Sequence, residues 1–176
     1  ENKDIEKSTE LFKKYISTEP DYELELMLNQ NIMSGMSRMA NNDEIEWEDS
    51  GHSAMMNSMS TSENVKWIIK DKKTGKANMD NNFKVKKGDV KKIRFFNNPD
   101  SMHPMQHPMH LHGQRFLVLS VDEKVNENLA WKDTVLVQTG KTVDIVVYFE
   151  NPGEWMLHCH IAEHLESGMM AQFTVS

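Results

Sequence analysis

Alternating apolar and polar residues recur along the chain in short segments that are separated by turn residues. This period of two is typical of half-buried strands, and it first occurs in residues 22–28. After residue 65 it returns in a series of segments: 66–70, 82–86, 90–96, 115–121, 133–137, 142–149, 154–158 and 170–175. Turn signals such as Lys87-Gly88-Asp89 and Asn151-Pro152-Gly153 lie between them. The pattern favours an all-β fold, an antiparallel β-sandwich of Greek-key type.

Two stretches depart from the strand pattern. Residues 1–20 are charged, and their apolar residues Ile5, Leu11, Phe12, Tyr15 and Ile16 recur at roughly helical spacing, which predicts a linker or a short helix. Residues 29–64 are rich in Asn, Ser, Met and Gly and are too long for an ordinary loop. We interpret them as a Met-rich, part-helical insertion in a domain that spans residues 21–176.

Composition narrows the classes of protein that fit. A chain of 176 residues suits one domain, and a net charge of −7 without a basic stripe argues against a nucleic-acid partner. A single cysteine excludes an internal disulfide, and no apolar run is long enough for a membrane span. Because the chain does not begin with Met, we expect Glu1 to be a processed end or the edge of a fragment.

The single cysteine, Cys159, lies between His158 and His160, with His164 five residues and Met169 ten residues after it. A thiolate, imidazoles and a thioether are the ligands of a blue-copper site, which is trigonal His₂Cys with a weak axial Met. The missing second histidine is expected from the other histidine-rich motif, His107-Pro-Met-His-Leu-His-Gly113. Each motif alone also fits a role without a metal: the cysteine could be a small buried hydrophobic residue, and the histidines could be surface pairs.

Strand geometry divides these residues into two groups. Residues two apart on a strand point to the same face, so His110 pairs with His112 and His158 pairs with His160. Cys159 must then point the opposite way from its two neighbours. One strand can therefore place its cysteine on one copper and its histidines on another metal cluster, which suits electron transfer between them.

At these residues the chain resembles the C-terminal cupredoxin domain of multicopper oxidases, the family of laccases and copper-efflux oxidases. The family pattern H-P-x-H-x-H-G stands at residues 107–113, and H-C-H-x-x-x-H-x-x-x-x-M stands at residues 158–169. Residues 131–135 resemble a further segment of the three-domain members. The resemblance implies a cupredoxin-like fold, a copper cofactor and oxidation of a reductant with dioxygen as acceptor, extracytoplasmically (periplasmic or secreted). It also implies a role in copper homeostasis if the likeness to copper-efflux oxidases holds.

Carried over residue by residue, the resemblance implies two sets of ligands. The type 1 copper, which accepts electrons, would be held by His107, Cys159, His164 and axial Met169. Electrons would pass through His158-Cys159-His160 to a trinuclear cluster, which reduces dioxygen to water. Its type 2 copper would be held by His110, and its type 3 pair by His112, His158 and His160. His52 and His103 lie outside both motifs.

The trinuclear cluster of this family takes His-x-His motifs from two domains, and this chain supplies half of them. The implied partner is the set of N-terminal cupredoxin domains of the same oxidase, or a second chain, and the isolated chain is expected not to reduce dioxygen. Two copies of this chain facing each other are a further hypothesis. The alternatives are a stand-alone blue-copper electron-transfer module without oxidase activity and a copper-storage or chaperone protein.

Methionine is over-represented, with 14 in the chain, and half of them lie between Met27 and Met59. Thioethers are soft ligands that favour Cu(I), although Met also fills irregular cores. Copper-efflux oxidases carry a Met-rich insertion in the same domain. We therefore expect Cu(I) or a phenol as reductant, with Cu(I) captured by the methionines of the insertion: Met33, Met36, Met39, Met55, Met56 and Met59.

Overall fold

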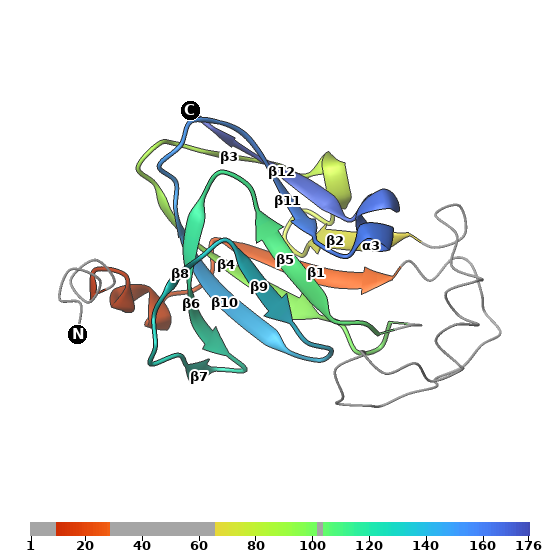
Figure 1. Cartoon of the computed structure of the whole chain (residues 1–176), viewed down its shortest axis with the longest axis horizontal. Helices are drawn as coiled ribbons and strands as arrows, with labels where there is room; N and C mark the ends of the chain where they lie inside the picture. The colour runs from red at the N-terminus through yellow and green to blue at the C-terminus, as the bar shows by residue number, and fades with distance from the viewer. Residues whose placement is uncertain (1–9, 29–65, 102–103) are drawn as a thin grey trace.

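Two β-sheets pack face to face in the computed structural model, which describes residues 10–28, 66–101 and 104–176 (Figure 1). The seven-stranded sheet has the order β2-β1-β4-β10-β6-β7, and β8 also pairs with β6. Its strands are β1 (Tyr22–Leu28), β2 (Trp67–Asp71), β4 (Val90–Asn97), β6 (Arg115–Val121), β7 (Lys124–Val125), β8 (Trp131–Lys132) and β10 (Thr142–Tyr148).

The five-stranded sheet has the order β3-β12-β11-β5-β9. Its strands are β3 (Asn82–Val85), β5 (His107–Leu111), β9 (Thr134–Val137), β11 (Gly153–Cys159) and β12 (Met170–Val175). The helices described are short: the 3-10 helices η1 (Lys13–Ser17) and η3 (Asn78–Asp80) and the α-helix α3 (Ala162–Glu166). None of the helices in the described ranges has the length and apolar character needed to cross a bilayer.

This architecture confirms the predicted β-sandwich, and each predicted segment agrees with an observed strand to within one residue at either end. The strands β5, β7 and β8 lie outside the predicted segments. The expectation of purely antiparallel pairing was wrong in two places, because β1 pairs with β4 and β12 pairs with β3 in parallel. The reason is the path of the chain, which passes through β3 of the opposite sheet between β2 and β4. Parallel neighbours need such a crossover connection.

The main core lies between the sheets and follows the alternation in the sequence. In β1, Leu24, Leu26 and Leu28 are buried, whereas the residues between them are partly exposed. They pack in one cluster with residues of the opposite sheet such as Leu111 and Phe173. Burial of apolar area at this interface is the main favourable contribution to folding.

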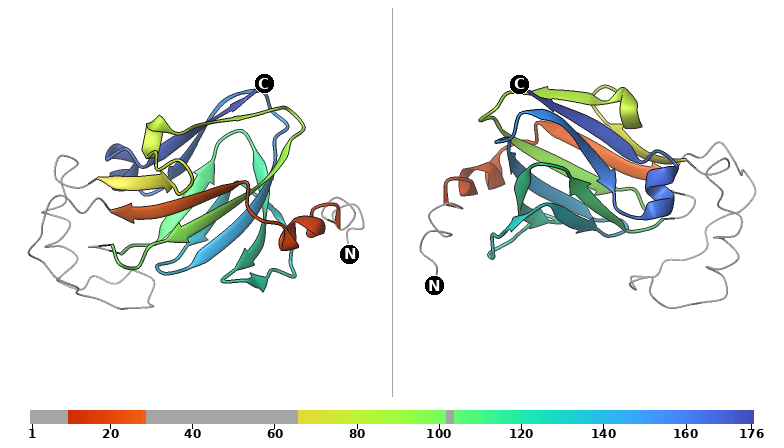
Figure 2. Two further views of the ribbon diagram at one scale, coloured as in Figure 1. Left: turned by 180° about the vertical axis from the view of Figure 1, so that it is seen from behind. Right: turned by 45° about the horizontal axis from the view of Figure 1, so that its top comes forward.

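A second, smaller core covers the outer face of the seven-stranded sheet. It explains why β6 is buried on both faces: Phe116 and Val118 face the main core, and Leu117 and Leu119 face the second one. Phe12, just before η1, packs there. Figures 1 and 2 show η1 at the end of the molecule opposite α3.

A buried ion pair fixes the N-terminal segment to this face. Lys92 is 2% exposed, and its Nζ donates to the carbonyls of Ile16 (3.1 Å) and Thr18 (2.8 Å) and lies 3.1 Å from Asp144 Oδ2. Arg94 adds two hydrogen bonds to the Asp144 carboxylate, of 2.7 and 2.8 Å. Burial alone would raise the pKa of Asp144, but the hydrogen bonds from Arg94 and Lys92 together hold this pKa below its ordinary value.

Asp144→Asn should destabilise the protein by about 3 kcal/mol at neutral pH, because it leaves Lys92 buried without its anionic partner. A depressed carboxyl pKa contributes stability above the unfolded-state value, about 3.9, and loses it as the pH falls through the folded-state value. The difference between the variant and the parent, measured by urea denaturation, should therefore shrink below about pH 4. Glu150→Gln, which breaks the exposed ion pair with Arg115, is the control and should cost less than about 1 kcal/mol. Equal losses in the two variants would contradict this account.

Candidate metal centres

Three of the predicted ligands meet in the interior of the sandwich. His107 begins β5, Cys159 ends β11, and His164 lies in α3, and all three are buried. The Sγ atom of Cys159 lies 3.4 Å from Nδ1 of His164 and 3.7 Å from Nδ1 of His107, and the two Nδ1 atoms are 3.2 Å apart. One thiol and two ring nitrogens thus converge on one point, as a His₂Cys copper site requires.

Strand pairing and one helical turn bring these residues together. β5 and β11 are neighbours, with Cys159 opposite Met109. After β11 the chain turns through α3, and its single turn returns His164 to the site. The sequence analysis predicts no helix here, because a five-residue helix is too short to show a helical period.

Met169, the predicted axial ligand, lies beside the thiol along the main chain. The backbone N–H of Cys159 donates to the carbonyl of Met169 (3.2 Å), and the N–H of Met169 donates to the carbonyl of His164 (3.0 Å). Met169 is fully buried, whereas Met170 is partly exposed. Of these two methionines, Met169 is therefore the one whose side chain is enclosed in the core at this end.

The remaining histidines of the two motifs form a second group on the other face of the same strands. His110 lies directly opposite His158 in the pairing of β5 with β11. Ligand atoms of His110, His112 and His158 lie within 4.8 Å of one another, and the ring of His160 is 5.7 Å from that of His158 and 5.8 Å from that of His110. The structure thus has the division that alternation predicts, with Cys159 on one side and its two neighbours on the other.

Hydrogen bonds orient two of these rings. Nδ1 of His110 contacts the carbonyl of Asp133 (2.9 Å) and the hydroxyl of Thr134 (3.0 Å), and Nδ1 of His158 contacts the carbonyl of Cys159 (2.8 Å). A carbonyl accepts, so each Nδ1 carries the proton and each Nε2 presents a lone pair. Metal-binding histidines are commonly fixed in this way. Asp133 and Thr134 were missed as orienting residues, since nothing in a strand sequence marks them.

Burial keeps the candidate ligands uncharged. The pKa of His107 is lowered well below its usual value, first by burial and then by the nearby His164. Burial also lowers the pKa of His112 and of His158, and the surrounding imidazoles act in the same direction. These histidines are therefore neutral at physiological pH, which is the state that binds metals.

The thiol is held in its protonated form. Burial raises the pKa of Cys159 to about 12, against the opposing effect of a hydrogen bond from the backbone N–H of Ile161. A metal ion that binds here must displace the thiol proton. The donor set fits copper, because a thiolate with imidazoles is a soft site.

The predicted Cu(I) ligands of the insertion lie outside the described residues: Met33, Met36, Met39, Met55, Met56 and Met59. His52 and His103, which belong to neither motif, lie outside them too. The segment that carries most of them connects the end of β1 to the start of β2, where Leu28 pairs with Trp67. Trp67 itself contacts the first group of ligands and was not predicted.

Comparisons with a family model and with curated relatives indicate the same family. The family model "Multicopper oxidase" matches residues 46–176. The chain is 39% identical over 122 residues to a multicopper oxidase of Staphylococcus aureus, an alignment of 60% of this chain and 27% of that protein. The chain thus spans about a quarter of the length of that curated relative.

Two solved structures are similar as well. A multicopper oxidase from Pediococcus acidilactici is 34% identical, with a TM-score of 0.53 over 61% of this chain and 23% of that one. A multicopper oxidase from Campylobacter jejuni, described as a metallo-oxidase, has a TM-score of 0.59 over 90% of this chain and 31% of that one. At 23% identity the second likeness concerns the fold alone.

Gly113, which directly follows His112, should not tolerate a side chain. Its φ is +64°, and a Cβ there would overlap the indole of Trp155, which is held by a 2.8 Å hydrogen bond to the carbonyl of Asn151. Gly113→Ala should cost about 1–3 kcal/mol more than Gly75→Ala, measured by urea denaturation. Gly75 is the matched control, because its φ is +73° and nothing lies within 4 Å of the added Cβ. If both variants lose the same stability, backbone strain alone explains the loss.

Proposed function

Because the chain belongs to the multicopper oxidase family, we propose that it is the C-terminal cupredoxin domain of a copper-dependent oxidase that uses dioxygen as electron acceptor. Copper, when bound, would take electrons from a reductant at the first group of ligands and deliver them at the second group to dioxygen, which is reduced to water. The protein's part is to hold, orient and separate the two groups.

The observation that carries this proposal is the position of Cys159 between the two groups. Its side chain lies among His107 and His164, and its sequence neighbours His158 and His160 lie with the second group. A few covalent bonds therefore join the two groups. His158 adds a second link, since its Nδ1 contacts the carbonyl of Cys159. An electron that arrives at the buried thiolate would leave through this strand.

Each residue has a role in the proposal. The type 1 copper would be held by His107, Cys159, His164 and Met169, which are all buried. His110 would hold the type 2 copper, oriented by Asp133 and Thr134. His112, His158 and His160 would hold the type 3 pair.

The second group is half of a trinuclear site, so another domain must complete it. The two motifs of the chain provide four histidines there: His110, His112, His158 and His160. We propose that N-terminal domains of the same oxidase, or a second chain, supply the remaining His-x-His motifs. Since the first group is complete within the described residues, the alternative function is a blue-copper electron-transfer module that works without oxygen chemistry.

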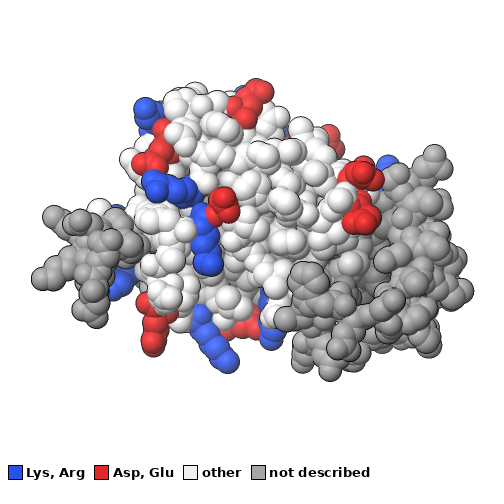
Figure 3. Space-filling model, viewed as in Figure 1, with Lys and Arg blue, Asp and Glu red and all other residues white. Residues whose placement is uncertain are grey.

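The reductant is proposed to be Cu(I) or a phenol, and the location extracytoplasmic, in line with a role in copper homeostasis. Figure 3 shows Lys and Arg interspersed with Asp and Glu on the face it presents. A nucleic-acid partner would need an extended basic patch, and this face does not have one.

The experiment that tests the function is copper loading of the chain, followed by visible spectroscopy and oxygen consumption. The chain should show the intense band of a thiolate–copper(II) bond, and Cys159→Ser should lose it. His110→Gln, the matched control in the second group, should keep the band. Alone, the chain should consume no oxygen with a phenol or Cu(I). With the further domains it should consume oxygen, and His110→Gln should then abolish the consumption.

Two outcomes contradict parts of this account. Absence of the band in the parent chain overturns the type 1 site and with it the proposed function. A band without oxygen consumption in the longer protein overturns the oxidase and favours the electron-transfer alternative.

The methionines of the insertion give a separate prediction. If they capture Cu(I), the chain should bind Cu(I) beyond one equivalent in a chelator competition, and deletion of residues 31–60 should abolish the excess. Met79→Leu is the control, because Met79 is an exposed methionine outside the insertion, 53% exposed, and its loss should change nothing. An unchanged stoichiometry in the deletion variant would show that the insertion does not bind Cu(I).

A further inference from the structure

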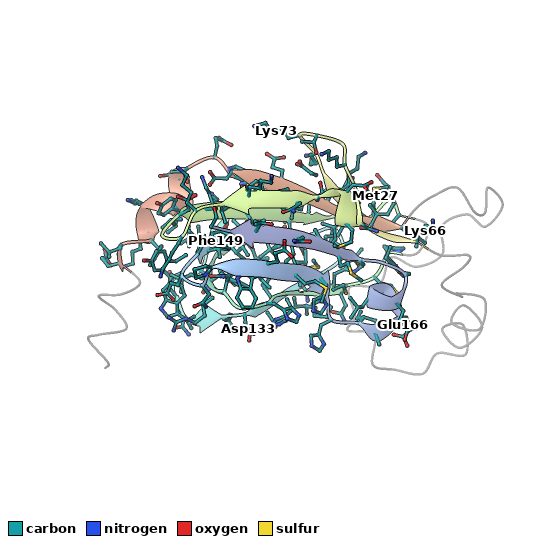
Figure 4. The ribbon with its side chains drawn as sticks, turned by 90° about the horizontal axis from the view of Figure 1, so that it is seen from above. Met27, Lys66, Lys73, Asp133, Phe149 and Glu166 are labelled. Carbon is teal, nitrogen blue, oxygen red and sulfur yellow. The ribbon has the colours of Figure 1, made fainter. Side chains whose placement is uncertain are left out.

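Trp67, a residue of the seven-stranded sheet, contacts the first group of ligands. It begins β2, at the edge of that sheet, whereas His107 and Cys159 belong to the five-stranded sheet. The Trp67 indole stacks on the ring of His164, with centroids 4.0 Å apart and planes at 27°, and meets the ring of His107 edge-on at 5.2 Å and 71°. Figure 4 labels Lys66 and Glu166, the sequence neighbour of Trp67 and the last residue of α3, at the same end of the sandwich.

The hydroxyl of Ser167 links the main chain of Trp67 to that of His164. The N–H of Trp67 donates to Oγ of Ser167 (3.4 Å), and that hydroxyl donates to the carbonyl of His164 (2.9 Å). On the other side, Asn78 donates to the carbonyl of Trp67 (2.9 Å) and accepts from the N–H of Ile69 (2.8 Å). The backbone of Trp67 is therefore held on two sides, and the residue is only 5% exposed.

His107, in the first group, needs a constraint of this kind. In the second group, His110 and His158 are oriented by hydrogen bonds at the nitrogen that does not face the cluster. Nε2 of His107 is buried and has no hydrogen-bond partner among the described residues. The contacts of this ring with His164 and Cys159 are both made at Nδ1, the nitrogen that faces the metal site. A ring that is not fixed at its other nitrogen can rotate about its χ2 angle, whose preference is broad. An aromatic neighbour restricts that rotation, because stacked and edge-on contacts have preferred geometries.

We propose that Trp67 is a positioning residue for the type 1 copper, which orients the imidazoles of His164 and His107 so that both Nδ1 atoms face Sγ of Cys159. This inference rests on the proposed function, which places copper at these three side chains. The indole acts by fixing the planes of the two imidazole rings. It also covers them with an apolar group, which keeps water from the ligand atoms.

Three variants separate this role from simple core packing. Trp67→Leu removes the aromatic face, Trp67→Phe retains most of it, and Phe83→Leu is the matched control. Phe83 is 7% exposed in the same core, and its ring packs against the rings of Tyr22 and Phe173. The copper-free full chain is titrated with Cu(II) to give its affinity. The thiolate–copper band, the electron paramagnetic resonance spectrum and the reduction potential are then recorded on the loaded chain.

Trp67→Leu should lower the Cu(II) affinity, followed through the thiolate–copper band, by about tenfold, as the loss of a residue that orients a metal ligand does. It should also change the band and the reduction potential. Trp67→Phe should recover most of the affinity. Phe83→Leu should lower the melting temperature and leave affinity, band and potential as in the parent. The proposal is overturned if Trp67→Leu keeps the parent's affinity and spectrum, or if Phe83→Leu changes them equally.

A second measurement covers the case in which Trp67→Leu does not fold. Incorporation of fluorotryptophan weakens the negative face of the indole at nearly constant volume. It should shift the band and the potential in the parent and leave them unchanged in Trp67→Phe, where the other tryptophans are still labelled. No shift in the parent overturns the role of Trp67 and leaves the type 1 site intact. Absence of the band in the unlabelled parent overturns both proposals.

Discussion

The register between β5 and β11 is the constraint on which the two metal centres depend. In this register His158 faces His110 and Cys159 faces Met109. Because side chains alternate along a strand, a slip of one residue would turn every side chain of β11 to the other face. The cysteine would then point towards the side of the second group, and His158 would point into the core. Leu157 of β11 opposes this slip, since it is buried opposite Leu111 and would become exposed.

The structure holds the donors of the first group close together and keeps His107 and Cys159 neutral. Burial lowers the pKa of His107 and raises that of Cys159, so neither group brings a charge into the core. Charges there would be expensive without a counter-ion. The sandwich therefore tolerates three ligand side chains in contact before any metal binds. When a copper ion replaces the thiol proton, the thiolate balances one of its positive charges.

Much of the fold and of the site was predictable from sequence because both follow short-range rules. Strand alternation identified β1 and β6 at their observed limits, and the spacing of His158, Cys159 and His160 was enough to divide them between two faces. Other features depend on residues far apart in the chain. The contact of Trp67 with His164 spans the two sheets, and the parallel pairing of β1 with β4 follows from the whole path of the chain. No local pattern encodes such contacts.

The buried lysine of β4 has a consequence for how freely the sequence before β1 can vary. Lys92 binds the segment through the carbonyls of Ile16 and Thr18, and every residue type has such a carbonyl. The partners of Lys92 there are thus parts of the main chain, and mutations at positions 16 and 18 leave them in place. Phe12 contributes its side chain, and Asp21 uses its carboxylate to accept from the N–H of Lys92. Substitutions should therefore accumulate between these two positions, while Lys92 itself stays constant.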